Sequence, residues 1–245
     1  MTNKIINEIS REIERNLLLI NIKIKQACKL YSKDKSKVNL IAVSKTQKVE
    51  KIYQAIALGC KIFGENYIKE SGEKWPEIKQ KFPEIKLHFI GNLQSNKTAE
   101  AVDLFDVIQT LDSEKLALTL KKEIAKQRKN PEIFIQVNIS EEPQKGGILP
   151  QDLKEFVKFS RDECGLNVTG LMCIPASYEL PSPYFALLKK LADENNLKNL
   201  SMGMSSDFAE AIAMNANYIR IGTAIFGERK KRGKIKWCAL DDSNV

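Results

Sequence analysis

The chain has 245 residues, of which 43% are hydrophobic and 29% charged, a composition typical of globular proteins. Its net charge of +8 is spread along predicted helices rather than gathered in one arm, so nucleic-acid binding is not predicted. A single histidine and five cysteines without a C-x-x-C pair argue against the common zinc sites and indicate reduced thiols in a cytoplasmic protein.

The first predicted element is a long amphipathic helix from Thr2 to Tyr31. The apolar residues Ile5, Ile9, Ile13 and Leu17 recur within it at helical spacing. Its stretch "NLLLINI" is short and lies between charged residues, so it predicts neither a targeting segment nor a membrane span. We therefore expect no membrane partner.

Short apolar runs then alternate with helical patterns. The predicted strands are Val38–Val43, Lys61–Phe63, Leu87–Ile90, Asp106–Leu111, Ile133–Asn138, Val168–Ile174, Leu200–Met204 and Tyr218–Ile221. Helical patterns between them include Val49–Leu58, Ser113–Lys129, Pro150–Glu163, Pro183–Asn195 and Ser206–Met214. Eight strands, each followed by a helix or helical turn, predict an α/β fold, a single (β/α)₈ barrel. An open doubly wound sheet is the alternative, but no G-x-G-x-x-G follows the first strand.

One domain is expected. The barrel with its extra N-terminal helix would occupy residues 1–230, and residues 231–245 would form a tail that continues the basic cluster "ERKKRGKIK". The stretch "ASYELPSPY" (176–184) is typical of a loop rather than of a domain boundary.

Polar residues and glycines follow the predicted strands. In a (β/α)₈ barrel the functional residues lie where strands end, so these segments are expected around one mouth. In chain order they are Ser44-Lys45-Thr46, "GEN" (64–66), "GNLQSNK" (91–97), Asn138, "IPAS" (174–177), "SSD" (205–207) and "GTAIFG" (222–227).

Lys45 is the sharpest candidate. A lysine at a strand end often extends its amine into water and does nothing more. Alternatively, partial burial lowers the pKa of the amine, and the neutral amine can attack a carbonyl and form a Schiff base.

The loops after the last two strands favour the second interpretation of Lys45. Ser205 and Ser206 offer hydroxyl groups just ahead of a predicted helix, and Gly222 and Thr223 let backbone N–H groups approach an anion. The plainer alternative makes Ser206 and Thr223 helix N-caps and Gly222 a turn residue. Together, on adjacent strands, the four residues suggest a phosphate site.

Four other residues have less distinct signals. Arg220, inside the last apolar run, lies either at the barrel rim or beside a buried acceptor, since an unpaired buried charge is costly. Asn66 and Asn138 suit turns. His88 is more often a hydrogen-bonded core histidine than a ligand.

The motifs resemble a known family. "LIAVSKT", "FGENYIKE", "LHFIGNLQSNK", "QVNISEEPQKGG", "GLMCIP", "LSMGMSSDFAEAI" and "YIRIGTAIFGER" follow the order found in the pyridoxal phosphate homeostasis protein family. The resemblance runs from about residue 5 to residue 230. One departure is Leu87, where the family usually has tryptophan.

The resemblance implies a barrel similar to the N-terminal domain of alanine racemase that binds pyridoxal 5′-phosphate (PLP). On the matching positions, Lys45 would hold PLP as a Schiff base and Asn66 would lie beside its ring. Ser205, Gly222 and Thr223 would bind the phosphate, with Ser206 nearby. Arg220 would face the pyridine nitrogen.

The resemblance also implies a protein that maintains PLP (vitamin B6) levels and has no established catalytic activity. Its expected partners are PLP, apo forms of PLP-dependent enzymes and free amino acids, and a monomer is expected. The alternative is a racemase-like PLP enzyme. Racemisation needs proton donors on both faces of the substrate, and the 18 residues after Gly227 are too few for a domain that would supply the second donor. The PLP carrier is therefore preferred.

Overall fold

The computed structural model describes residues 3–176 and 178–228. The predicted tail, residues 231–245, lies outside the described residues, and so does Cys238. The other four cysteines are free thiols, as predicted.

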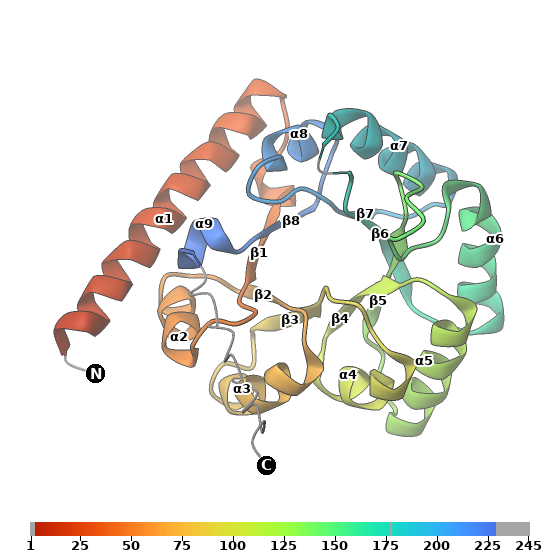
Figure 1. Ribbon diagram of the computed structural model, residues 1–245, viewed down its shortest axis with the longest axis horizontal. Coiled ribbons are helices and arrows are strands. Elements are labelled where there is room, and N and C mark those ends of the chain that lie inside the picture. Colours follow the sequence, from red (N-terminus) through yellow and green to blue (C-terminus); the bar gives the residue numbers. More distant parts are fainter. Residues whose placement is uncertain (1–2, 177, 229–245) are drawn as a thin grey trace, which may run out of the picture.

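Eight parallel strands form a closed barrel, which confirms the predicted fold (Figure 1). They pair in chain order, and β1 also pairs with β8 to close the ring. The strands are β1 (Asn39–Val43), β2 (Ile62–Glu65), β3 (Lys86–Phe89), β4 (Val107–Leu111), β5 (Glu132–Val137), β6 (Val168–Cys173), β7 (Asn199–Ser201) and β8 (Tyr218–Ile221).

Helices surround the barrel (Figure 1). The α-helices are α1 (Asn3–Leu30), α2 (Val49–Ala57), α3 (Ile68–Lys81), α4 (Thr98–Leu104), α5 (Glu114–Gln127), α6 (Leu153–Lys158), α7 (Pro181–Glu194), α8 (Phe208–Ala213) and α9 (Thr223–Phe226). Short 3₁₀ turns are η1 (Lys35–Lys37), η2 (Ser95–Lys97) and η3 (Pro150–Asp152), and a π-helical turn, η4 (Phe159–Glu163), extends α6.

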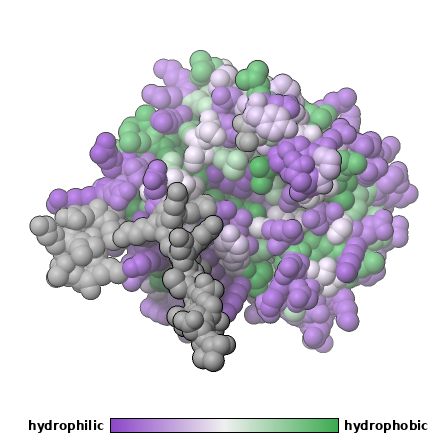
Figure 2. All heavy atoms as spheres, in the orientation of Figure 1, coloured by the Kyte–Doolittle hydropathy of each residue, from purple (hydrophilic) through white to green (hydrophobic). Residues whose placement is uncertain are grey.

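The long helix α1 packs on the outside of the barrel, where it contacts α2, α8 and α9 (Figure 1). Ile13 and Leu17 are buried on one face of α1, as predicted, and Ile20 and Ile24 continue that face. The side chains of Ile5 and Ile9 lie outside those that the structure describes. No helix within the described ranges is both long and apolar enough to cross a bilayer. Hydrophilic side chains cover much of the face that Figure 2 shows, with smaller hydrophobic areas between them.

The barrel interior is filled by two kinds of layer. Val107, Phe134 and Met172 form a small apolar cluster against Tyr218. Gln109 follows Val107 by two residues on β4, and Arg220 follows Tyr218 by two residues on β8. A buried polar layer therefore lies nearer the carboxyl ends of the strands than the apolar cluster does. Inward-facing side chains in layers are usual for this fold. The polar layer is therefore the one directly beneath the mouth.

Seven of the eight strands differ from the prediction by one residue at one or both ends, and two strand ends differ by more. β7 ends at Ser201, because Met202–Met204 turn into the following loop, and Gly203 there has a φ of +88°. β2 continues to Glu65, which the sequence placed in a loop. The helices named from the sequence also did not include α3, which contains Pro76, or the short α4.

Candidate functional site

The predicted site residues lie on or just after four neighbouring strands, β7, β8, β1 and β2. In the barrel, Val43 of β1 pairs with Gly64 of β2, and Ile41 of β1 pairs with Arg220 of β8. Lys45 comes two residues after Val43, so it leaves the barrel between the ends of β2 and β8. The fold thus gathers the predicted site residues at the carboxyl ends of adjacent strands, where barrels of this class carry their chemistry.

The loop that carries Lys45 is fastened on both sides of the lysine. The Ser44 carbonyl accepts a hydrogen bond from Lys74 Nζ at 3.2 Å, and the Thr46 N–H donates to Glu70 Oε1 at 2.6 Å. Thr46 has a φ of +62°, which is costly for a β-branched residue. The bond to Glu70 helps to hold that conformation. Half-buried Lys45 therefore leaves the strand from a constrained backbone.

A buried carboxylate anchors this loop from behind. Glu65 is fully buried, and its Oε1 accepts hydrogen bonds from Ser44 Oγ (2.8 Å), Lys74 Nζ (2.7 Å) and Trp75 Nε1 (3.1 Å). Burial raises the pKa of this carboxyl, and Lys74 opposes that shift. The expectation that all of "GEN" lies at the mouth is therefore wrong for Glu65. The strand continues through Glu65, and its side chain turns outward to α3.

The sequence reasoning missed the part that α3 plays. Glu70 and Lys74 form an i,i+4 ion pair on this helix, with 2.8 Å between Glu70 Oε1 and Lys74 Nζ. Lys74 also pairs with the buried Glu65 at 2.7 Å. The i,i+4 spacing was the available signal, but surface pairs of this kind are common and worth little. Only the fold shows that this pair supports the Lys45 loop.

Arg220 lies inside the barrel beneath the mouth and is only 5% exposed. Its Nη1 donates to Ser201 Oγ and its Nη2 to the Cys173 carbonyl, both at 2.8 Å. Among the described residues, no carboxylate lies within ion-pair distance of the guanidinium, so both acceptors are neutral. Burial lowers the pKa of Arg220, as expected for a cation removed from water. The charge of Asp207 opposes that shift without forming an ion pair with Arg220, so the guanidinium keeps donors for a bound group that offers an acceptor.

His88 is a fully buried residue of the barrel interior, as the plainer interpretation predicted. Its Nδ1 is 2.8 Å from Gln109 Nε2, and its ring packs on Tyr218 with 5.4 Å between the ring centroids. Its Nε2 has no hydrogen-bond partner among the described residues. Burial, with a smaller effect of Lys86, lowers the pKa of His88 to about 3.

We expect this buried histidine to make folding pH-dependent. The unfolded chain takes up a proton on His88 below its ordinary pKa of 6.5, whereas the folded protein does not until about pH 3. The contribution to the free energy of unfolding is therefore lost as pH falls between these values, by up to about 1.4 kcal/mol per pH unit. Urea unfolding at several pH values would measure it. The slope should be shallower in His88→Gln, and equal slopes in both proteins would contradict the expectation.

The phosphate-site candidates lie on two exposed turns. Ser205 and Ser206 precede α8, and Thr223 is the first residue of α9. The three side chains are exposed, and within the described ranges their hydroxyl groups make no hydrogen bond. The N-cap alternative is wrong for Ser206 and Thr223, because Asp207 and Gly222 occupy the cap positions. These hydroxyl groups are therefore available to a ligand.

Gly222 lies tightly against the end of β1. A Cβ built on Gly222 would lie 3.2 Å from the Val43 carbonyl oxygen and 3.3 Å from Val43 Cβ. These distances are shorter than ordinary van der Waals contact, so a larger residue would push on the strand that leads to Lys45. The two halves of the candidate site are thus packed directly on each other.

The two asparagines at strand ends differ in role. Asn66 is half-buried, and its Oδ1 is buried without a hydrogen-bond partner in the described part of the chain. Asn138 instead closes its own loop, since its Nδ2 donates to the Glu142 and Lys145 carbonyls at 2.9 and 3.3 Å. Asn138 is therefore a turn residue, whereas Asn66 keeps an unused acceptor.

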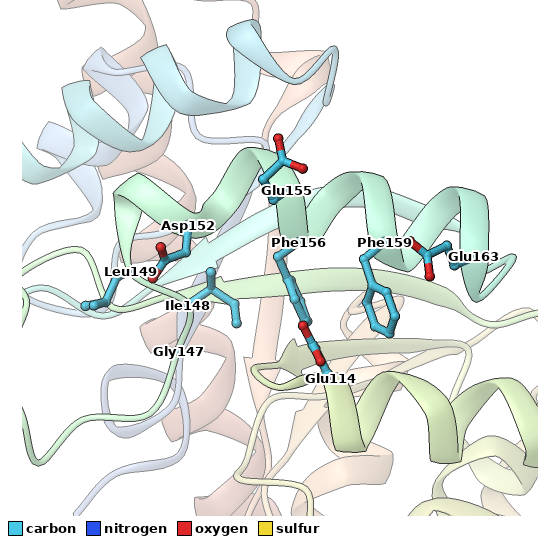
Figure 3. Close-up of a pocket in the computed structure, with 9 residues that line it drawn as sticks. All are labelled: Glu114, Gly147, Ile148, Leu149, Asp152, Glu155, Phe156, Phe159 and Glu163. Atoms are coloured by element: carbon cyan, nitrogen blue, oxygen red, sulfur yellow. The ribbon is translucent and has the colours of Figure 1, made fainter.

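A pocket of about 590 Å³ lies outside the candidate site. Its walls come from α5, the β5–α6 loop and the α6–η4 segment. Figure 3 shows Phe156 and Phe159 pointing from the α6–η4 segment toward α5, where Glu114 lies. No predicted site residue lines this pocket. Within the described residues no cluster of histidine, cysteine and carboxylate side chains could hold a metal ion.

The barrel and its mouth define a class of protein. Residues 22–230 match the family model described as the alanine racemase N-terminal domain. The chain is also 40% identical to the pyridoxal phosphate homeostasis protein of Pasteurella multocida over 227 residues, which cover 89% of this chain and 97% of that one. The chain belongs to the pyridoxal phosphate homeostasis protein family, which confirms the resemblance seen in its motifs.

Solved structures agree with this assignment. The PipY protein of Synechococcus elongatus, solved with PLP bound, is 33% identical and has a TM-score of 0.71, with 84% of this chain and 100% of PipY covered. A protein of unknown function from Bifidobacterium adolescentis is 28% identical with a TM-score of 0.85, and the match covers 89% of this chain and 96% of that one.

Proposed function

We propose that this protein binds PLP as a Schiff base on Lys45 and maintains PLP homeostasis by releasing the cofactor to apo-enzymes, with residues 1–230 as the binding unit. The names of its relatives and the PLP in PipY support the proposal. The single observation that carries it is the buried guanidinium of Arg220, which has no carboxylate partner among the described residues and lies on the strand next to the one that leads to Lys45. An acceptor such as a pyridine nitrogen would satisfy it.

The residues of the mouth fit the chemical groups of PLP. Arg220 offers N–H donors for the ring nitrogen, and the exposed hydroxyl groups of Ser205, Ser206 and Thr223 suit a phosphate. The N–H groups of Thr223 and Ala224, at the start of α9, make no backbone hydrogen bond in the described part of the chain and also suit an anion, and Gly222 places no side chain in their way. Asn66 would lie beside the ring.

PLP brings an aldehyde, which condenses reversibly with a primary amine, and an electron-withdrawing ring. The chain's own contribution is to place the Lys45 amine and hold its loop through Glu70 and Lys74. The reversibility of the Schiff base suits a carrier, since a competing amine can displace Lys45. Free amino acids and the active-site lysines of apo-enzymes are such amines, so we propose both as partners.

We also propose that the protein is not an enzyme. A guanidinium keeps its proton, so Arg220 would leave the pyridine nitrogen unprotonated. An unprotonated ring withdraws electrons weakly and does little to stabilise negative charge on a substrate carbon. Arg220 therefore argues against broad carbanion chemistry on the cofactor.

Transfer of PLP tests the proposal directly. The protein would be loaded with PLP, freed of excess cofactor by gel filtration and mixed with the apo form of a PLP-dependent aminotransferase. We expect aminotransferase activity to return, because the acceptor lysine displaces Lys45. Protein reduced with borohydride beforehand is the control, since its cofactor is locked in place and should restore no activity.

A chiral assay of amino acids incubated with the loaded protein addresses the alternative. We expect no more than trace conversion of common L-amino acids to their D forms. Rapid racemisation that disappears in Lys45→Ala would contradict the carrier role.

A further inference from the structure

A row of polar side chains crosses the barrel interior beneath the mouth. Arg220 Nη1 donates to Ser201 Oγ at 2.8 Å, and Ser201 Oγ donates to Gln109 Oε1 at 2.6 Å. Gln109 Nε2 lies 2.8 Å from His88 Nδ1. The four residues come from β8, β7, β4 and β3 and are all buried. They form one continuous chain of hydrogen bonds from the candidate cofactor site to the opposite wall.

The guanidinium at one end and the orientation of the Gln109 amide, with Oε1 toward Ser201 and Nε2 toward His88, together set the direction of the bonds in this chain. A guanidinium can only donate, so Ser201 Oγ accepts from Arg220 and can give its own hydrogen to Gln109 Oε1. The Gln109 amide then turns its NH₂ group toward His88. Nδ1 of His88 must accept that hydrogen bond, so the neutral ring carries its proton on Nε2.

The chain holds Arg220 without neutralising it. Its three other members are a hydroxyl, an amide and an imidazole, none of which carries a negative charge. The second bond of the guanidinium goes to the Cys173 carbonyl, which is also neutral. In the described part of the chain only two of the five N–H donors of Arg220 are used, so its orientation is fixed while its charge and its other donors stay available.

We propose that Ser201, Gln109 and His88 are positioning residues that fix the direction of the Arg220 guanidinium beneath the mouth. This role rests on the proposed function, in which that guanidinium faces the ring nitrogen of PLP. A strand position that required only packing would favour an apolar residue, because buried polar groups are costly unless they are hydrogen-bonded. Holding Arg220 in one orientation explains why Ser201, Gln109 and His88 are polar although they are buried.

The tautomer of His88 tests the direction of the chain without any cofactor. The protein has a single histidine, so long-range ¹H–¹⁵N correlation spectra of labelled PLP-free protein report on His88 alone. We expect the Nε2–H tautomer at pH 7. The control Thr110→Val should leave it unchanged, because the buried hydroxyl of Thr110, the residue after Gln109, has no partner among the described residues. A proton on Nδ1 would overturn the proposed chain.

The effect on cofactor retention tests the positioning role. Ser201→Ala removes a hydrogen bond to a charged group, and Gln109→Leu removes the support of Ser201. In equilibrium dialysis we expect Ser201→Ala to retain PLP about tenfold less well than the wild type. Gln109→Leu should lower PLP retention by a smaller factor. Thr110→Val should behave like the wild type. Borohydride should still trap PLP on Lys45 in both chain variants, which separates misplaced Arg220 from a damaged barrel.

Two failures would be distinguishable. If wild-type protein binds PLP and both chain variants retain it equally well, the positioning role is overturned and the proposed function stands. If the wild-type protein binds no PLP, the proposed function fails and this role of the chain fails with it, whichever tautomer His88 adopts.

Discussion

Replacing Lys45 by alanine is expected to abolish covalent attachment of PLP to this protein. Lys45 lies in the β1–α2 loop two residues after the end of β1, and the hydrogen bonds of Ser44 and Thr46 hold the backbone on either side of it. Borohydride reduction should therefore trap PLP on a single lysine in the wild type. Mass mapping of peptides from the reduced protein would identify that lysine.

Lys48 provides the matched control for this experiment. It lies three residues further along the same loop and is exposed, at the N-cap of α2. Lys48→Ala should retain the full covalent adduct, whereas Lys45→Ala should lose all of it. The chain has 32 lysine residues, so nonspecific labelling is a real alternative. Trapping spread over surface lysines, or unchanged in Lys45→Ala, would show that the assignment of Lys45 is wrong.

Much of the fold could be predicted because buried parallel strands have a simple signal. Their two faces are covered by the barrel interior and by helices, so runs such as Ile133–Val137 are nearly continuous in apolar residues. Eight such runs determine the architecture even when their ends are misplaced. The ends were less predictable, because Met202–Met204 are as apolar as a strand but turn away from the barrel.

The supporting residues of the site could not be predicted for a different reason. Gln109 and Ser201 are separated by 92 positions in the sequence, and only the closed barrel brings them into hydrogen-bonding distance. Gln109 lies within an apolar run and Ser201 lies at the end of one. A polar residue in such a place does not reveal which residue it will bind. Lys45 and Gly222 were easier to predict, because they follow strands and the chemistry of a barrel is concentrated there.

Arg220 illustrates what the three-dimensional arrangement adds. An arginine within an apolar run predicted either a rim position or a buried acceptor, and the structure supplies two buried acceptors, Ser201 and the Cys173 carbonyl. It also shows that no described carboxylate pairs with the charge. The sequence contains 31 acidic residues and cannot tell which of them lie near Arg220. That no described carboxylate forms an ion pair with Arg220 is thus a property of the fold.

Enlarging Gly222 is expected to weaken PLP retention more than removing Lys45 does. Lys45→Ala would remove the proposed covalent link and leave the proposed phosphate contacts of the mouth intact. In Gly222→Leu, the new Cβ would lie 3.2 Å from the Val43 carbonyl oxygen, and the rest of the side chain would occupy space where backbone N–H groups meet an anion. Loss of one or two charge-assisted hydrogen bonds should lower retention at least about tenfold.

Gly72→Leu is the control for this substitution, because Gly72 is exposed on α3 and nothing lies within 4 Å of a Cβ built there. Equilibrium dialysis of the wild type, Gly222→Leu, Gly72→Leu and Lys45→Ala would rank their retention of PLP, with thermal unfolding to verify that each is folded. We expect Gly72→Leu to match the wild type and Gly222→Leu to retain least. Because Gly222 also packs on the strand that leads to Lys45, trapping by borohydride should slow in the same variant. If the Gly222→Leu protein is folded and retains PLP as well as the wild type does, the turn at Gly222 is not part of the phosphate site.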